Sequence, residues 1–589
     1  MSKKSSTNFV YSILFGLLIL CLLLVVNHLD FNINTKSISA FSILGAIIVY
    51  LLLTPKSYNK IKYYFNELDW ADEVIKYYQS IPSLYRKSFW ISFGFINLAF
   101  LFHTINFMWG ATDWEAVRFN VDNASAIKDG NFTAFTLQNI LFGGKILPVI
   151  NNLWSFFGLS LSGILLAYYW NMPKKTSTYV ITSLFMAVTP YTLSIMYFTQ
   201  YTLGNLWLPA FIIGGLILSN KATQTLNRSY LYNLLSISLF IIALGTYLPI
   251  INFFGIVLLG KIFLNVITKG TSLRDNFFLY LQALANFTAS VLIYIFVILL
   301  LKLNGNAISI SNVDFYDAIQ NIPSLISSMF TQFATTIPFV DLSYKIIALI
   351  IVITSIFAVI FKAPSTKASI KGLALIPCIL VSSKISYLFN ADTNSILHGY
   401  NSFYSLPILY TLMYATLIKL DGEYLKRFAY TLAVLLIFMS FVRISYGLKV
   451  WKFGFDAETK LAERIITRME KMDNFNIDKK YKLLQIGSKS LRHKYYIKKD
   501  SEQKSPELLD LAYYDEKISK DAYNFFYQAD FLSKNVTIKE ASQNEALKNF
   551  ILKDARSWPD KNSIFIHDDY IVFVLDDKAL YKAQQELSK

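Results

Sequence analysis

Charged residues are scarce in this sequence: Asp, Glu, Lys and Arg make up 16% of its 589 residues, whereas average soluble domains carry about 25%. Apolar side chains make up 54% of the chain, and aromatic residues alone make up 16%. A chain with so few charges cannot cover a large core with a polar surface. The composition therefore argues against a water-soluble protein and favours one embedded in a membrane.

Cysteine is almost absent, and acidic residues are in the minority. Cys21 and Cys378 both lie inside apolar runs, which argues against a disulfide framework and against a thiolate metal site. The formal net charge is +16, but most Lys and Arg before residue 448 lie in short segments between apolar runs. Membrane orientation explains cations in such segments, so nucleic-acid binding is not expected.

Apolar runs of the length that crosses a bilayer recur through the first three quarters of the chain. The first run, which reaches Asn27, is followed by no evident cleavage site and is predicted to be a retained anchor helix. Two runs, near 232–247 and 249–266, lie almost end to end, and Pro249 either separates two helices or marks a kink within tightly coupled ones. We expect about thirteen spans, near 9–27, 38–54, 90–110, 147–170, 178–198, 202–219, 232–247, 249–266, 278–303, 345–361, 372–389, 403–419 and 428–447.

Lys and Arg are distributed unequally between alternate connecting segments. One set of segments is rich in cations and is predicted to be cytoplasmic, because cationic loops stay on that side of the membrane. The other set is poor in them: residues 304–344 contain no Lys or Arg, and neither do residues 390–402. These segments, together with 28–37 and 111–146, are predicted to face outward.

The character of the sequence changes after Gly447, where charged and apolar residues begin to alternate. A helix is predicted over residues 455–472, and short β-branched runs predict strands at 482–486 and within 563–575. The expected fold is thus a polytopic α-helical membrane unit over residues 1–447, with a small α/β domain over residues 448–589 on the extracytoplasmic side.

The outward segment 111–146 gathers acidic and basic side chains beside the end of a predicted span. Asp113 and Glu115 are carboxylates that can take a proton from an acceptor hydroxyl, and Arg118 and Lys145 are cations that can stabilise a phosphate leaving group. These residue types suit sugar transfer from a lipid phosphate. A structural alternative stays open, because Thr112-x-x-Glu115 also reads as a helix capping box.

Several motifs in this chain resemble the Gtr-type glucosyltransferases of bacterial O-antigen modification, which belong to the GT-C class of polytopic glycosyltransferases. The order of these motifs along the chain matches the family. They are Asp113-Trp114, Asp129-Gly130, Leu147-Pro148, Thr189-Pro190-Tyr191, Ser272-Leu273-Arg274-Asp275-Asn276 and the segment from Phe455 to Arg468.

This resemblance implies transfer of a hexose, typically glucose, from a polyprenyl-phosphate carrier to a surface polysaccharide such as O-antigen. It implies that Asp113 is the catalytic carboxylate, with Glu115 the next candidate. The implied location is the bacterial plasma membrane, with the site on the extracytoplasmic face. No metal ligands are predicted, although a divalent cation as cofactor stays open.

Further polar residues of the outward segments are candidates for binding. Arg118, Lys145 and His398 are predicted to hold the donor phosphate, and Asp129, Asp392 and Tyr400 to contact the acceptor. His103 lies inside a predicted span, where polar side chains are costly and often functional. Clustered aspartates near the C-terminus can either bind a cation or solubilise the ends of a strand; they are Asp568, Asp569, Asp576 and Asp577.

A lipid-linked-sugar flippase or transporter is the main alternative function, since such a protein is also polytopic and also handles a charged lipid. Transporters commonly show internal repeats and ionisable residues at the membrane midplane. No internal repeat is evident here, and the acidic residues gather in an outward segment instead.

Overall fold

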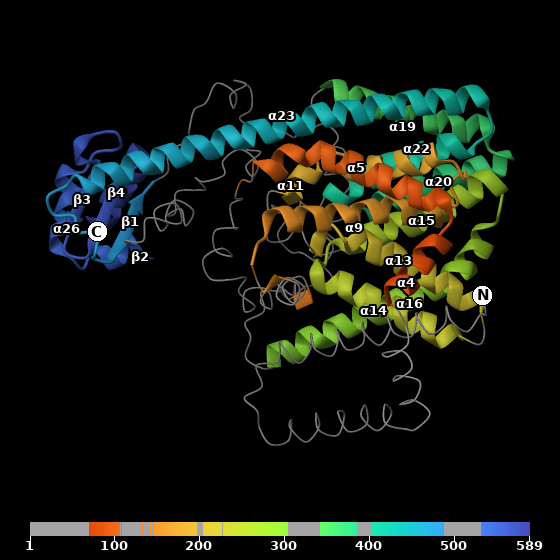
Figure 1. Cartoon of the computed structure of the whole chain (residues 1–589), viewed down its shortest axis with the longest axis horizontal. Coiled ribbons are helices and arrows are strands. Elements are labelled where there is room, and N and C mark those ends of the chain that lie inside the picture. The colour runs from red at the N-terminus through yellow and green to blue at the C-terminus, as the bar shows by residue number, and fades with distance from the viewer. Residues whose placement is uncertain are drawn as a thin grey trace, which may run out of the picture.

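The computed structural model of the chain describes residues 70–106, 108, 132–133, 142–143, 145–196, 204–225, 228–303, 342–383, 385, 402–487 and 532–588. The predicted spans near 9–27 and 38–54 lie outside these residues. Most of what is described is a bundle of helices packed side by side, and a small sheet domain stands apart from it (Figure 1).

The helices of the bundle follow one another with short connections. α4 (Trp70–Ser80) precedes the bundle proper. The remaining helices are α5 (Ser83–Ile105), α9 (Pro148–Tyr169), α10 (Thr176–Ala187), α11 (Thr192–Met196), α13 (Leu208–Gln224), α14 (Ser229–Thr246), α15 (Ile250–Lys269), α16 (Leu273–Leu303), α19 (Leu342–Lys362), α20 (Thr366–Ser382), α22 (Ser402–Lys419) and α23 (Glu423–Glu470).

Seven helices among the described residues are long and apolar enough to cross a membrane: α5, α9, α14, α15, α16, α19 and α23. The protein is therefore a helical, membrane-embedded one, whereas the expected count of thirteen spans is not confirmed. One reason is that the apolar run near 178–198 is not a single helix. α10 ends at Ala187 and α11 begins at Thr192, because Pro190 cannot continue a helix from the preceding turn.

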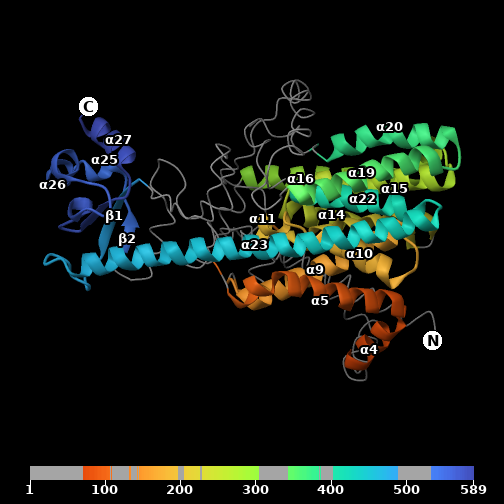
Figure 2. The ribbon, with the colours of Figure 1, turned by 90° about the horizontal axis from the view of Figure 1, so that it is seen from above.

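The cations of the bundle gather at one end. α9, α13, α15, α19 and α22 finish at this end and their successors start there, so the short turns between them bring their cations together (Figure 2). We call it the basic end, and the other the far end. The connecting turns and flanking helix ends here carry Lys174, Lys175, Lys221, Arg228, Lys269, Arg274, Lys362, Lys367, Lys419, Lys426 and Arg427.

α4 is attached to the start of α5 at the basic end. The indole Nε1 of Trp90 donates to the hydroxyl of Tyr78 at 2.7 Å, and the guanidinium of Arg86 lies 5.2 Å from the centre of the same ring. α4 exposes Val74 and Ile75, as expected for a helix that lies along a membrane surface.

Small side chains bring the helices of the bundle close together. A Cβ placed on Gly163 of α9 would lie 2.3 Å from the Cα of Ser183 in α10. A Cβ placed on Gly215 of α13 would lie 2.4 Å from a ring carbon of Phe240 in α14. In a lipid environment the hydrophobic effect does not drive helices together, so close packing of small residues and interhelical hydrogen bonds hold them.

Hydrogen bonds between side chains join α13, α14 and α16 inside the bundle. The Nδ2 of Asn286 donates to the Oγ of Ser219 and to the Oδ1 of Asn233, both at 3.0 Å. The hydroxyls of Ser219 and Ser236 lie 2.7 Å apart. These contacts satisfy polar groups that the bilayer leaves without water.

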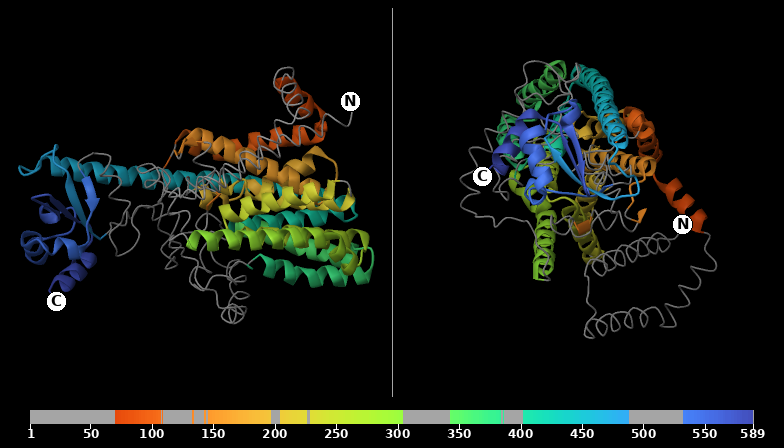
Figure 3. Two further views of the ribbon diagram at one scale, coloured as in Figure 1. Left: turned by 90° about the horizontal axis from the view of Figure 1, so that it is seen from below. Right: turned by 90° about the vertical axis from the view of Figure 1, so that its left-hand side faces the viewer.

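α23 is a single helix of 48 residues that continues from the bundle into the sheet domain (Figures 1 and 3). The predicted span near 428–447 and the helix predicted over 455–472 are thus two parts of one helix. No Pro occurs between these two segments, so the sequence contains no residue there that must end a helix. α23 places the sheet domain beyond the far end of the bundle.

The C-terminal domain contains a sheet of four strands in the order β2-β1-β4-β3. The strands are β1 (Tyr481–Ile486), β2 (Leu532–Asn535), β3 (Ile564–His567) and β4 (Tyr570–Val574). β1 pairs in parallel with β2 and β4, while β3 and β4 form an antiparallel pair. The α/β character and the strands predicted at 482–486 and within 563–575 are confirmed.

Both faces of this sheet are covered, which explains why β1 and β4 are apolar on both sides. Tyr481 and Leu483 of β1 pack with Leu461 and Ile465 of α23. On the other face, the cluster that includes Ile486 is completed by shorter helices. These are α25 (Ile538–Ala541), α26 (Glu545–Asn549), the π-helical turn η4 (Phe550–Asp554) and α27 (Asp577–Leu587).

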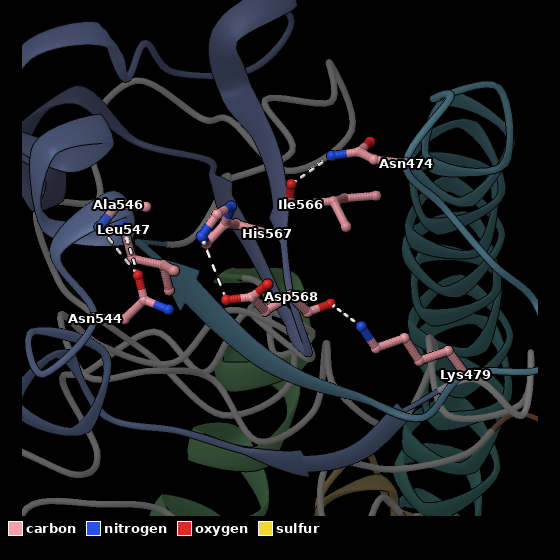
Figure 4. A network of polar contacts seen from close by, with 8 residues as sticks. All are labelled: Asn474, Lys479, Asn544, Ala546, Leu547, Ile566, His567 and Asp568. Carbon is pink, nitrogen blue, oxygen red and sulfur yellow. Dashed lines mark hydrogen bonds and ion pairs between the residues drawn. The ribbon is translucent and has the colours of Figure 1, made fainter.

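Polar contacts tie the segment after α23 to the β3–β4 hairpin (Figure 4). The Nδ2 of Asn474 donates to the carbonyl of Ile566 at 2.5 Å, and the Nζ of Lys479 donates to the carbonyl of Asp568 at 2.5 Å. The Nε2 of His567 lies 3.3 Å from a carboxylate oxygen of Asp568. The two contacts from Asn474 and Lys479 therefore hold the segment that follows α23 against one edge of the sheet.

Trp558 lies between the sheet and α23, in the same buried cluster as residues of both. It is 6% exposed, and the guanidinium of Arg468 in α23 lies 4.5 Å from its ring centre. The same guanidinium donates to the carbonyls of Pro559 and Asp560 at 3.1 and 2.9 Å. Trp558 and Arg468 thus form one contact that combines apolar burial, a cation–π interaction and hydrogen bonds.

Trp558→Ala is expected to destabilise the C-terminal domain by about 3 to 5 kcal/mol, because it deletes a large buried side chain and leaves a cavity. Protease resistance of this domain in the full-length protein measures the loss. Tyr581→Ala is the matched control, since Tyr581 of α27 is 62% exposed. Equal resistance of the two variants would contradict a joining role for Trp558.

Candidate functional site

Most residues of the predicted site lie outside the described part of the chain. These are Asp113, Glu115, Arg118, Asp129, Asp392, His398 and Tyr400. Lys145 is the exception. It is exposed and lies two residues before Leu147, the residue that precedes the first turn of α9, so it stands at the far end of the bundle.

The Leu147-Pro148 motif fixes where α9 begins. Leu147 has an extended backbone (φ −109°, ψ 93°), which is the conformation that a following proline imposes. Pro148 occupies the first helical position, where its missing N–H costs nothing. Since α5 ends at Ile105 and α9 begins at Pro148, the acidic segment 111–146 connects two helix ends at the far end of the bundle.

Buried polar side chains gather where those two helix ends meet. We call this group the polar cluster: His103, Thr104, Asn151, Asn152 and Ser155. His103, Asn151, Asn152 and Ser155 are all 0% exposed. The Nδ2 of Asn152 donates to the hydroxyl of Thr104 at 3.4 Å and so joins α9 to α5.

The imidazole of His103 stacks on the indole of Trp451, with ring centres 4.9 Å apart. Trp451 belongs to α23, so three helices meet at the polar cluster. The predicted interior position of His103 within a span is confirmed by its burial in α5.

Asn151 is the least satisfied member of the polar cluster. Neither its Oδ1 nor its Nδ2 has a hydrogen-bond partner among the described residues, and the Oγ of Ser155 likewise has none there. Leaving a buried polar group unpaired costs about 1 to 3 kcal/mol. A cost of that size is tolerated when a ligand supplies the missing hydrogen bonds, and buried polar groups in membrane helices commonly mark ligand sites.

The polar cluster can bind hydroxyl groups but supplies no carboxylate. Amide, hydroxyl and imidazole groups donate and accept hydrogen bonds, as sugar hydroxyls require. Proton abstraction needs a further group, which the sequence provides in Asp113 and Glu115. We did not identify Asn151, Asn152 and Ser155 from the sequence. Three polar residues early in an apolar run, directly after Leu147-Pro148, could have indicated a buried polar site.

The C-terminal aspartates have structural roles. The Asp576 side chain accepts from the backbone N–H of Ala579 at 2.9 Å and caps α27, and Asp577 lies in the first turn of that helix. A carboxylate oxygen of Asp569 lies 2.6 Å from the Nζ of Lys482. In the part of the chain that is described, no group of three or more His, Cys, Asp or Glu side chains has a metal-binding arrangement.

The Lys482–Asp569 pair makes stability depend on pH at both extremes. The hydrogen bond from Lys482 lowers the pKa of Asp569 below 3.8, and the hydrogen bond to Asp569 raises the pKa of Lys482 above 10.5. The contribution of Asp569 is present above its unfolded pKa and is lost as pH falls through its folded pKa. The contribution of Lys482 is present below its unfolded pKa and is lost as pH rises through its folded pKa.

Asp569→Asn is therefore expected to destabilise the C-terminal domain slightly at neutral pH, and to have less effect in strong acid. Denaturant titrations of the full-length protein over this pH range measure the difference, which is small because both side chains contact water. A difference between variant and wild type that stays constant from neutral to strongly acidic pH would contradict this role of the pair.

Comparisons with known proteins identify no relative: no protein-family model, no curated protein and no solved structure matches the chain.

Proposed function

We propose that the protein is a membrane hexosyltransferase that moves a sugar, glucose by the family resemblance, from a polyprenyl-phosphate carrier to a cell-surface glycan. The polar cluster is the observation that carries this proposal. It contains the buried side chains of Asn151 and Ser155, which have no hydrogen-bond partner among the described residues, near the helix ends that segment 111–146 connects. A site for sugar hydroxyls beside a catalytic carboxylate has this composition.

In the proposed reaction, the carboxylate of Asp113 takes the proton of an acceptor hydroxyl as its oxygen bonds to the anomeric carbon of the hexose. The bond from that carbon to the carrier phosphate breaks, and polyprenyl phosphate leaves with the electron pair. Arg118, Lys145 and His398 stabilise the leaving phosphate. Glu115 is the second candidate for the base, and Asp129, Asp392 and Tyr400 contact the acceptor.

The C-terminal domain has a place in this proposal. α23 runs without a break from the bundle to the sheet, and the domain stands beyond the far end, to which α9 contributes its polar N-terminal turns (Figure 1). A rigid helix holds a domain at a defined distance better than a flexible linker does. The domain is proposed to position a polymeric acceptor, with both parts on the extracytoplasmic side of the bacterial plasma membrane.

A transfer assay tests the proposed activity. Membranes that contain the protein are given radiolabelled polyprenyl-phosphate glucose and candidate surface glycans, and label in the glycan is measured. Label is expected to enter the glycan. Movement of the lipid across the membrane without transfer to glycan would instead favour the flippase.

Accessibility labelling tests the orientation. Single cysteines placed in segment 111–146, in a chain whose Cys21 and Cys378 have been replaced, are treated with a membrane-impermeant thiol reagent. We expect labelling from the extracytoplasmic side. Labelling only from the cytosol would exclude a site that meets a surface glycan.

A further inference from the structure

A cavity of about 560 Å³ opens at the basic end, away from the polar cluster. Residues near the ends of α5, α9, α10, α13, α15 and α16 line it. Its volume falls within the range of about 300 to 1,000 Å³ that is usual for small-molecule sites.

The lining of this cavity is cationic. The described residues that line it include four lysines and no Asp or Glu. Lys174, Lys221 and Lys269 are exposed at the mouth, whereas Lys261 is 4% exposed and lies deeper. The preference of lysine for cytoplasmic loops explains cations in the turns, but it does not explain a lysine buried inside the apolar sequence of α15.

The way in which α9 ends explains one of the hydrogen bonds of Lys261. Asn171 adopts a left-handed backbone (φ 53°), the N–H of Met172 donates to the carbonyl of Ala167, and the N–H of Asn171 donates to that of Tyr168. This Schellman-type ending leaves the carbonyls of Tyr169 and Trp170 to be satisfied by other groups.

Two lysines from other helices meet these carbonyls. The Nζ of Lys261 donates to the carbonyl of Tyr169 at 2.5 Å, and the Nζ of Lys419 donates to that of Trp170 at 2.8 Å. In the orientation of the Asn171 side chain that satisfies both amide atoms, its Nδ2 donates to the carbonyl of Tyr168 at 3.3 Å and its Oδ1 accepts from the Nζ of Lys261 at 2.9 Å. One of the three donor positions of the Lys261 ammonium is left over for a ligand.

Helix dipoles do not cancel the charge of the lysines. A helix C-terminus carries about half a negative charge and an N-terminus about half a positive charge. The C-termini of α9, α13 and α15 and the N-termini of α5, α10 and α16 lie at this cavity, so their contributions roughly cancel. The four lysines therefore leave the cavity with a net positive charge. An anion with more than one negative charge matches it best.

The remaining wall supplies further hydrogen-bonding groups. The Nδ2 of Asn265 donates to the Oδ1 of Asn276 at 3.0 Å and to the hydroxyl of Tyr280 at 3.2 Å. Tyr280 and Asn265 both line the cavity, as do Tyr85 and Tyr168 near its mouth. Hydroxyl and ammonium donors together are the usual partners of phosphate oxygens.

We propose that this cavity binds a phosphate group, carried either by the headgroup of a membrane lipid or by a soluble phosphorylated compound. The site is separate from the polar cluster, and the proposal does not depend on the proposed transfer reaction. Lys261, the lysines of the mouth and the hydroxyl of Tyr280 contact the phosphate oxygens, and Tyr85 and Tyr168 contact the group to which the phosphate is attached.

Binding to the full-length protein in detergent micelles tests the proposal, with thermal stability as the readout. The probes are phosphatidic acid, glucose 1-phosphate, and diacylglycerol with the acyl chains of the phosphatidic acid. We expect at least one of the two phosphates to raise the unfolding temperature in a saturable manner, and diacylglycerol to have no effect. A response to phosphatidic acid alone assigns the site to a lipid, and a response to glucose 1-phosphate assigns it to a soluble compound.

Two double variants separate this site from general charge effects. Lys221→Gln with Lys269→Gln removes two cations of the mouth and is expected to weaken phosphate binding about tenfold for each lysine. Lys362→Gln with Lys367→Gln removes two exposed cations of the same end that do not line the cavity, and should leave affinity unchanged. No response to either phosphate, or equal weakening in both double variants, would overturn the proposal.

Discussion

Asp113→Asn lowers hexose transfer by about a hundredfold to ten-thousandfold in the mechanism proposed above. An asparagine side chain keeps the shape and a hydrogen-bonding oxygen but cannot take a proton, and a positioned general base contributes a factor of about that size. The expected loss lies in kcat, because proton transfer belongs to the transition state and not to donor binding. Initial rates with labelled polyprenyl-phosphate glucose measure it.

Asp122→Asn is the matched control, since it makes the same chemical change in the same outward segment at a residue that is assigned no role in transfer. It should retain transfer close to that of the wild type. Transfer by Asp113→Asn at the wild-type rate would remove Asp113 from the mechanism, and a selective loss in Glu115→Gln would move the role of base to Glu115.

Hydropathy predicted the helices of the bundle closely where apolar runs were long. α15 and α16 were expected near 249–266 and 278–303, and they extend over Ile250–Lys269 and Leu273–Leu303. Pro249 lies between α14 and α15, so the interpretation that it separates two helices is the one that the structure shows. These helices can be predicted from the sequence because a segment that crosses a bilayer must satisfy its backbone polar groups internally, and so forms one continuous helix with mostly apolar side chains.

The strands of the C-terminal domain were predictable for a related reason. β1 and β4 are buried on both faces, so both are mostly apolar runs, and they are bounded by Gly487 and by aspartates. β2 was missed because Leu532–Asn535 is a short edge strand with only one neighbour, and such a strand needs no apolar alternation.

The polar side chains inside the bundle were harder to predict because their role depends on helices that are distant in sequence. The ammonium of Lys261 donates to the carbonyl of Tyr169, which lies 92 residues away in the sequence. A hydropathy average over the apolar run of α15 does not reveal this lysine. Asn151 lies early in the apolar run of α9, and its complete burial depends on the packing of helices that are distant in the sequence. In both cases the cost of burying the polar group signals function or capping, but the partner becomes evident only in three dimensions.

Gly163→Ala is expected to destabilise the bundle by about 3 kcal/mol, at the upper end of what overpacking usually costs. The added Cβ would lie 2.3 Å from the Cα of Ser183 and 2.5 Å from its Oγ. A backbone atom cannot move aside as a flexible side chain can, so α9 and α10 must separate. Loss of that much stability removes a large part of a typical total of 5 to 15 kcal/mol, and thermal unfolding in detergent measures it.

Two further variants make this prediction specific to the α9–α10 contact. Gly94→Ala in α5 is the control, because no atom of the other described residues, the backbone of its own helix apart, lies within 4 Å of its added Cβ and alanine is the better helix former by about 1 kcal/mol. It should be neutral or stabilising. Ser183→Gly combined with Gly163→Ala should restore stability only in part, since it removes the Cβ and Oγ of residue 183 but leaves the Cα in place; complete restoration would mean that the backbones are not as close as 2.3 Å implies.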